Sequence, residues 1–167
     1  MTRTATVRLV PVGGGALGPS RRPQVRALPG LSALGVTHLV TLLSAREGAR
    51  VVGTAARRAG LEWTWVDLAH GCVPPATRDG ELAGAATRVA STLWEGAGVV
   101  IHCSAGVHRT GMFAQAVLRA TGLDAEGARR VVERMRPDTA EGVGAHRLAW
   151  ADDLSVTMGW GTRVAPD

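Results

Sequence analysis

The residues best suited to chemistry lie in one stretch, from Val99 to Gly111, which has the sequence VVIHCSAGVHRTG. Its apolar start predicts a buried strand that ends near Cys103, and a helix is predicted to begin at Thr110. A short loop containing Gly106 connects the two. The backbone N–H groups of such a loop, with the positive end of the helix dipole behind them, bind anions. The stretch therefore predicts that a sulfur nucleophile and a bound anion lie together.

Cys103 and Arg109 are the predicted catalytic pair of this loop. The thiolate is the nucleophilic form of cysteine, and helix N-termini and nearby cations stabilise it. The planar guanidinium of Arg109 can bind two oxygens of a phosphoryl group, which a lysine could not do. The expected phosphate-binding residues are Ser104, Ala105, Gly106, Val107, His108 and Arg109.

Two other interpretations of the same residues lead elsewhere. In the first, Cys103 is a small buried apolar residue and Arg109 a surface residue, but the agreement of strand, glycine and helix start disfavours this. In the second, zinc is bound by side chains of ligand type, namely His70, Cys72, His102 and Cys103. Adjacent residues on a strand point to opposite faces, and no Cys-x2-Cys spacing occurs. We therefore expect neither a metal ion nor an organic cofactor.

The elements around this stretch predict an α/β fold. Strands are expected near residues 7–12, 38–43, 61–68 and 99–102, and helices near 45–59, 81–95, 110–120, 124–136 and 145–154. Strands that alternate with helices are typical of a mostly parallel central sheet flanked by helices. Gly13 to Pro23 is interpreted as a loop, because its glycines and prolines break regular structure. We expect residues 1–167 to form a single domain.

The composition limits the class of protein. Hydrophobic residues make up 46% and charged residues 20% of the chain, which is close to globular averages and excludes a disordered protein. No apolar stretch approaches the about 20 residues of a membrane span, and the N-terminal residues lack the apolar segment of a signal peptide. We expect a monomeric cytoplasmic protein with no membrane partner. All 19 basic residues are arginines spread along the chain, so the net charge of +5 does not indicate nucleic acid.

The order His-Cys, five residues, Arg-Thr-Gly in residues 102–111 resembles the active-site loop of the cysteine-dependent protein tyrosine phosphatase superfamily. Residues 31–43, followed by Glu47, are similar to the N-terminal half of its compact, atypical dual-specificity-like members. Residues 134–137 (RMRP) are similar to the segment after their active-site helix. The resemblance implies a dual-specificity-phosphatase-like fold. It also places at Thr110 a hydroxyl that stabilises the sulfur as it leaves the phosphoenzyme.

The same resemblance implies a hydrolase of phosphate monoesters that forms a phosphocysteine intermediate. Its substrates would be phosphotyrosine, phosphoserine or phosphothreonine in proteins. Residues 108–111 (HRTG) are also similar to a plant- and fungi-type branch, some of whose members hydrolyse inositol pyrophosphates, although Val107 stands where that branch usually has lysine. A non-protein substrate, such as an inositol phosphate or an RNA 5′-phosphate, therefore stays open as an alternative.

The general acid is where this sequence departs from the family, which uses an Asp about thirty residues before the nucleophile. An ungapped fit of residues 61–75 places His70 at that position, 103 − 70 = 33 residues before Cys103. A protonated imidazole can do the same work. Asp67 is the second candidate and Asp79 the third. If none of them serves, the chain is a catalytically weak phosphate-binding module that lacks the usual Asp acid.

Overall fold

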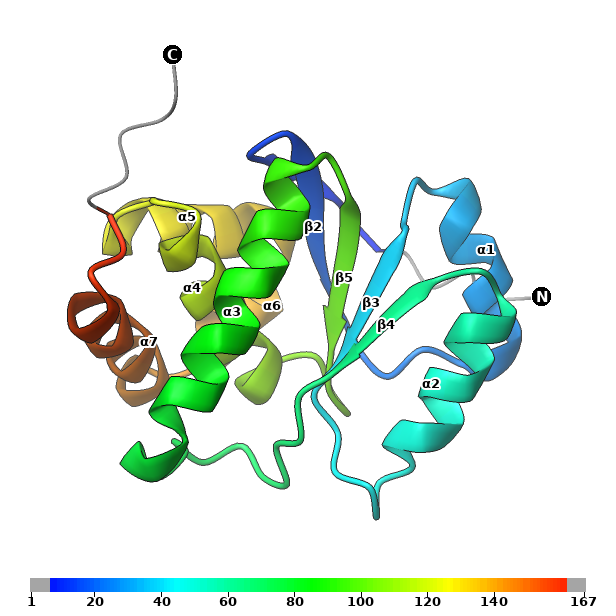
Figure 1. The fold of residues 1–167 in the computed structure, drawn as a ribbon, viewed down its shortest axis with the longest axis horizontal. Coiled ribbons are helices and arrows are strands. Elements are labelled where there is room, and N and C mark those ends of the chain that lie inside the picture. Colours follow the sequence, from blue (N-terminus) through cyan, green and yellow to red (C-terminus); the bar gives the residue numbers. More distant parts are fainter. Residues whose placement is uncertain (1–6, 162–167) are drawn as a thin grey trace.

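A computed structural model describes residues 7–161 of the chain. A five-stranded sheet forms the centre of the molecule (Figure 1). The strands stand in the order β1-β2-β5-β3-β4. Only β1 and β2 pair in antiparallel fashion, and the other three neighbouring pairs are parallel. The predicted α/β class with a mostly parallel sheet is confirmed. The strands are β1 (Val10–Val12), β2 (Gly15–Ser20), β3 (His38–Thr41), β4 (Glu62–Trp65) and β5 (Gly98–His102).

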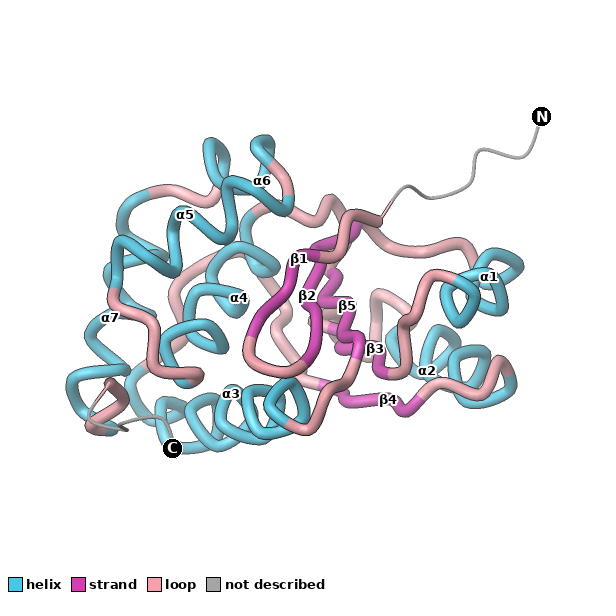
Figure 2. Tube along the Cα trace, turned by 90° about the horizontal axis from the view of Figure 1, so that it is seen from above, coloured by secondary structure: helices cyan, strands magenta, loops and turns pink. Residues whose placement is uncertain are grey.

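Helices cover both faces of the sheet (Figures 1 and 2). One face carries α1 (Leu28–Ala33) and α2 (Ala49–Arg58). The other helices gather on the opposite side: α3 (Asp79–Trp94), α4 (His108–Ala120), α5 (Ala125–Met135), α6 (Pro137–Gly142) and α7 (Ala145–Met158). Two short 3-10 helices, η1 (Val25–Ala27) and η2 (Ala76–Arg78), precede α1 and α3. No helix within residues 7–161 is long and apolar enough to span a bilayer.

The central strand β5 is buried along its whole length. Val99 and Ile101 pack in the larger apolar core together with residues of α3 and α4, while Val100 packs in the smaller core with residues of α1 and α2. Successive side chains of a strand point to opposite faces, so a strand covered on both faces is apolar throughout. This burial fixes where β5 ends, and therefore where Cys103 stands.

The prediction of a loop from Gly13 to Pro23 is wrong, because residues 15–20 form β2 beside β5. A Cβ atom at Gly15 would come within 2.2 Å of the Ala97 carbonyl oxygen, and one at Gly18 within 2.6 Å of the Arg8 carbonyl oxygen. The small residues thus permit a close approach of neighbouring backbone. Pro19 is tolerated because β1 pairs with β2 only as far as Leu17.

The predicted helices differ from the observed ones mainly at their ends. Residues 45–48 form a turn, and α2 begins only after Gly48, whose φ of +87° suits glycine. The predicted helix end before Pro137 is confirmed, because α5 ends at Met135. The sequence does not predict α6, which begins at Pro137, since a proline at the first helical position loses no intrahelical hydrogen bond.

Candidate active site

The segment between β5 and α4, residues 103–109, is called the Cys103 loop below. Cys103 is buried, with only 3% of its surface exposed. Its Sγ accepts hydrogen bonds from the Gly106 N–H at 3.3 Å and from the Thr110 hydroxyl at 3.0 Å. Two donors directed at one sulfur stabilise a thiolate relative to a thiol, because hydrogen bonds to an ionised acceptor are the stronger ones. The predicted positions of Cys103 and Thr110 therefore come together in space.

The carbonyl groups of the Cys103 loop are bound from outside. Arg136 Nη1 donates to the carbonyls of Ala105 at 3.1 Å and Gly106 at 3.0 Å, and the Thr139 hydroxyl donates to the latter at 2.7 Å. In a planar trans peptide the next N–H points opposite to the carbonyl. The N–H groups of Gly106 and Val107 are therefore directed to the side of Cys103 Sγ, where an anion would bind.

Gly106 cannot be replaced without disturbing this arrangement. Its φ of +73° is in the region that favours glycine. A Cβ atom there would also come within 2.5 Å of the Ser20 carbonyl oxygen. The end of β2, which the sequence does not predict as a strand, thus lies against the Cys103 loop and shapes it.

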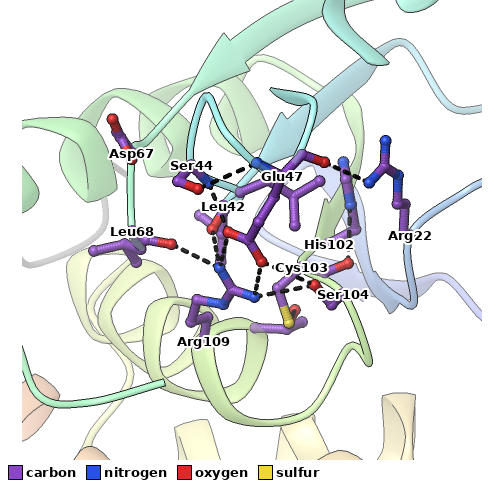
Figure 3. Close-up of polar contacts among 12 residues, drawn as sticks. Arg22, Leu42, Ser44, Glu47, Asp67, Leu68, His102, Cys103, Ser104 and Arg109 are labelled. Atoms are coloured by element: carbon purple, nitrogen blue, oxygen red, sulfur yellow. Dashed lines mark hydrogen bonds and ion pairs between the residues drawn. The ribbon is translucent and has the colours of Figure 1, made fainter. Parts of the chain in front are cut away.

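Arg109 is held from several sides and is only 8% exposed (Figure 3). Its Nη1 and Nη2 donate to the two carboxylate oxygens of Glu47, at 2.8 and 2.9 Å. Nη2 also donates to Ser104 Oγ at 3.1 Å, and Nη1 to the carbonyls of Leu42 at 3.3 Å and Leu68 at 2.7 Å. Cys103 also raises the pKa of Arg109, after the larger contribution of Glu47. The guanidinium is therefore oriented before any anion binds.

The carboxylate of Glu47 balances the buried guanidinium of Arg109. The hydrogen bond from Arg109 is the main reason that the pKa of Glu47 falls to about 2, and in return Glu47 raises the pKa of Arg109. Ser44 orients Glu47 by a reciprocal pair: the Ser44 N–H donates to Glu47 Oε2 at 2.9 Å, and the Glu47 N–H donates to Ser44 Oγ at 3.3 Å. The role of Glu47 is not predicted from the sequence, although the Ser-x-x-Glu spacing is a capping-box signal.

His102 is a structural residue of the strand end. Its Nε2 lies 2.8 Å from Thr41 Oγ1, and its Nδ1 lies 3.2 Å from the Cys103 carbonyl oxygen. Thr41 Oγ1 in turn accepts a hydrogen bond from Trp63 Nε1 at 2.9 Å. Burial lowers the pKa of His102 to about 4, so the ring is neutral and both nitrogens are engaged. The zinc interpretation finds no support in this arrangement, and no group of three potential ligands in residues 7–161 could hold a metal ion.

The three candidates for the general acid lie in different surroundings. The carboxylate of Asp67 is exposed and points away from Arg109 and Cys103 in Figure 3. Asp79 accepts a hydrogen bond from Trp150 Nε1 at 3.2 Å at the start of α3. His70 is exposed.

The loop that carries Asp67 and His70, residues 67–75, is called the His70 loop below. A methyl group added at Gly71 would come within 3.1 Å of His108 Cβ, so this loop lies against the Cys103 loop. Of the three candidates, His70 is next to that contact.

A known family matches the part of the chain that contains this site. Residues 76–130 match the tyrosine phosphatase family. Solved phosphatase structures superpose on nearly the whole chain. The domain has the fold of the cysteine-dependent protein tyrosine phosphatases. The predicted resemblance to the compact dual-specificity-like phosphatases is thereby confirmed.

Three structures illustrate the similarity of this phosphatase fold. Tk-PTP in its active form shares 22% identity at a TM-score of 0.68, covering 98% of this chain and 100% of its own. Kinase-associated phosphatase, with its catalytic-site cysteine replaced by serine, shares 11% identity at a TM-score of 0.79, with the same coverage. PTPMT1 in complex with PI(5)P shares 15% identity at a TM-score of 0.68, covering 90% of this chain and 96% of its own. No curated protein matches the chain.

Proposed function

We propose that this domain hydrolyses phosphate monoesters through a phosphocysteine intermediate on Cys103. The observation that carries the proposal is the pair of donors on Cys103 Sγ within a loop whose N–H groups face the sulfur. Arg109 stands beside it with its guanidinium fixed by Glu47. Nucleophile, oxyanion donors and cation thus occupy one site, which is the arrangement that phosphoryl transfer needs.

In the first step the Cys103 thiolate attacks phosphorus. The S–P bond forms as the P–O bond to the leaving group breaks, and the electron pair of that bond goes to the leaving oxygen. The loop amides and Arg109 stabilise the charge on the remaining phosphoryl oxygens. His70 protonates the leaving oxygen, with Asp67 as the second candidate for that role.

In the second step water attacks the phosphocysteine. The acid of the first step, now deprotonated, accepts a proton from this water, and the S–P bond breaks to release inorganic phosphate. The electron pair returns to sulfur, where the Thr110 hydroxyl and the Gly106 N–H stabilise the thiolate. Neither step requires a metal ion or an organic cofactor.

As substrates we propose phosphotyrosine, phosphoserine or phosphothreonine in proteins, as for dual-specificity phosphatases. We also propose that residues 1–167 form a single domain that acts as a monomer in the cytoplasm. A small anionic phosphate ester is the second candidate. It is favoured by the similarity to PTPMT1, whose structure contains PI(5)P. Arginines near the site, Arg22 and Arg136, suit either class of anionic substrate.

The proposal is tested by steady-state hydrolysis of p-nitrophenyl phosphate. We expect Cys103→Ser to lower the rate by at least about 10³-fold, because no nucleophile of comparable strength replaces the thiolate. The exposed Cys72 provides the matched control, and Cys72→Ser should leave the rate unchanged. Inorganic phosphate should protect Cys103, but not Cys72, from alkylation by iodoacetate. Vanadate binding without hydrolysis in the unmodified protein would instead indicate a phosphate-binding module.

A further inference from the structure

Three arginines from three different elements bind backbone carbonyls of the His70 loop. Arg78, at the end of η2, donates to the Asp67 carbonyl at 2.7 Å. Arg109 donates to the Leu68 carbonyl at 2.7 Å. Arg147, in the first turn of α7, donates through Nε to the Gly71 carbonyl. The loop has no regular secondary structure between β4 and η2, so these contacts hold it in place of a helix or strand ladder.

Arg147 differs from the other two arginines in the second carbonyl that it binds. Its Nη1 donates at 2.7 Å to the carbonyl of Val143, a buried residue of the larger core. One guanidinium thus bridges the His70 loop and the helical side of the domain, although Arg147 and Gly71 are 76 residues apart. Its planar fork is suited to such a bridge, because two of its N–H groups are held at a fixed angle.

The Gly71 carbonyl is the anchor nearest to His70. Only one peptide unit separates it from the imidazole, whereas the carbonyl bound by Arg78 belongs to Asp67, at the beginning of the loop. Gly71 also lies against His108 of the Cys103 loop. A displacement at Gly71 would therefore change the distance between His70 and an oxygen bound above Cys103.

We propose that Arg147 is a positioning residue that sets the reach of the general acid, by holding the Gly71 carbonyl and with it His70. The inference rests on the proposed function, because it concerns proton delivery in the same reaction. Arg147 itself does not touch the reacting atoms. Its removal should lower kcat/KM only for substrates whose leaving oxygen must be protonated in the transition state. This parameter covers the steps up to the phosphocysteine and leaves out its hydrolysis, in which His70 would act on every substrate alike.

The test compares two aryl phosphates in the purified protein. p-Nitrophenyl phosphate has a good leaving group, while phenyl phosphate has a poor one. We expect Arg147→Ala to lower kcat/KM on phenyl phosphate by about 10-fold, since a misplacement of about 1 Å can cost up to 10²-fold, and on p-nitrophenyl phosphate by less than about 2-fold. Arg147→Lys should fall between, because its ammonium group keeps the charge and can bind the Gly71 carbonyl, but it lacks the fixed planar donors that bind two carbonyls at once.

Two control variants separate this role from a general effect. Arg130→Ala removes an exposed arginine that pairs with Glu126, and it should change neither rate. Arg78→Ala removes the anchor at Asp67, and its effect on phenyl phosphate should be smaller than that of Arg147→Ala. A larger effect of Arg78→Ala would place the acid at the Asp67 end and overturn the role of Arg147.

The other outcomes of this test distinguish failure of the inference about Arg147 from failure of the proposed function. Equal losses on both substrates in Arg147→Ala, or an unchanged rate on phenyl phosphate, would overturn the inference while the phosphatase activity of the unmodified protein stands. No hydrolysis of p-nitrophenyl phosphate by the unmodified protein would instead overturn the proposed function. A melting temperature and a vanadate affinity close to those of the unmodified protein will show that the Arg147 variant is folded and that its Cys103 loop is intact.

Discussion

The Cys103 loop and the His70 loop lie against each other but are held in different ways. In the Cys103 loop the functional side chains are themselves fixed: Sγ accepts two hydrogen bonds, and the guanidinium of Arg109 binds a carboxylate, a hydroxyl and two carbonyls. In the His70 loop the arginines bind backbone carbonyls, and the side chains of the candidate acids Asp67 and His70 are exposed.

This difference indicates that the two loops have different functions, one in binding the phosphoryl group and the other in delivering the proton. A site that binds the transferred phosphoryl group binds the same chemical group in every substrate. Rigid placement of its donors therefore does not restrict the range of substrates that the site accepts. A proton donor meets leaving groups of different shape and basicity. Changes in the Cys103 loop should therefore lower kcat/KM on all substrates, whereas changes in the His70 loop should lower kcat/KM only on those with poor leaving groups.

The largest effect is expected from Arg109→Lys. Lysine keeps the charge, but it cannot bind both oxygens of Glu47 and a phosphoryl group at once. We expect kcat/KM to fall by about 10² to 10³-fold on both p-nitrophenyl phosphate and phenyl phosphate, and vanadate affinity to fall as well. Near-normal kinetics in this variant would show that the phosphoryl group is bound elsewhere.

A smaller and more selective effect is expected from His70→Ala. The value of kcat/KM on phenyl phosphate should fall by about 10²-fold, while that on p-nitrophenyl phosphate changes much less. His70→Ala should also abolish the part of the pH dependence of this parameter on phenyl phosphate that comes from loss of the acid's proton.

Asp67→Asn is the matched variant for this prediction. It should leave both rates nearly unchanged, because the carboxylate of Asp67 points away from Cys103 (Figure 3). If Asp67→Asn abolishes the phenyl phosphate rate while His70→Ala does not, the acid is Asp67, and the loop has a second arrangement in which that carboxylate turns inward.

The smallest effect is one on stability alone, at His102 below the Cys103 loop. Burial lowers the pKa of His102 from 6.5 to about 4 in the folded protein. Between these two pH values the unfolded chain binds a proton at His102, whereas the folded protein does not. This contribution to stability is complete above pH 6.5 and is lost as the pH falls. The free energy of unfolding should decrease by about 2 kcal/mol between pH 7.5 and 5, and by about 3 kcal/mol in all.

Urea unfolding at both pH values measures this loss. His102→Gln should remove most of the pH dependence in that interval, whatever it does to stability at pH 7.5. Glu47 does not interfere, because its pKa falls from 4.5 to about 2, and the stability linked to it is lost only below pH 4.5. An unchanged pH dependence in His102→Gln would assign the effect to other groups.

The sequence by itself determines the Cys103 loop and the α/β class. A fully buried strand, a glycine and a helix start follow one another within residues 99–111, so the chemistry of the loop is set by short-range order. The alternation of strands and helices is equally visible in local patterns. These features depend on side-chain type and spacing, which a linear sequence contains.

The tertiary structure alone decides β2, the partner of Arg109 and the placement of the His70 loop. β2 is a strand because the backbone of Arg8 and Ala97 packs against its glycines, and no local propensity reports such a contact. Glu47 meets Arg109 across 62 residues, and Arg147 meets Gly71 across 76. Every residue has a backbone carbonyl, so the type of the acceptor residue does not indicate that an arginine binds it. The sequence therefore cannot reveal which arginine holds which loop.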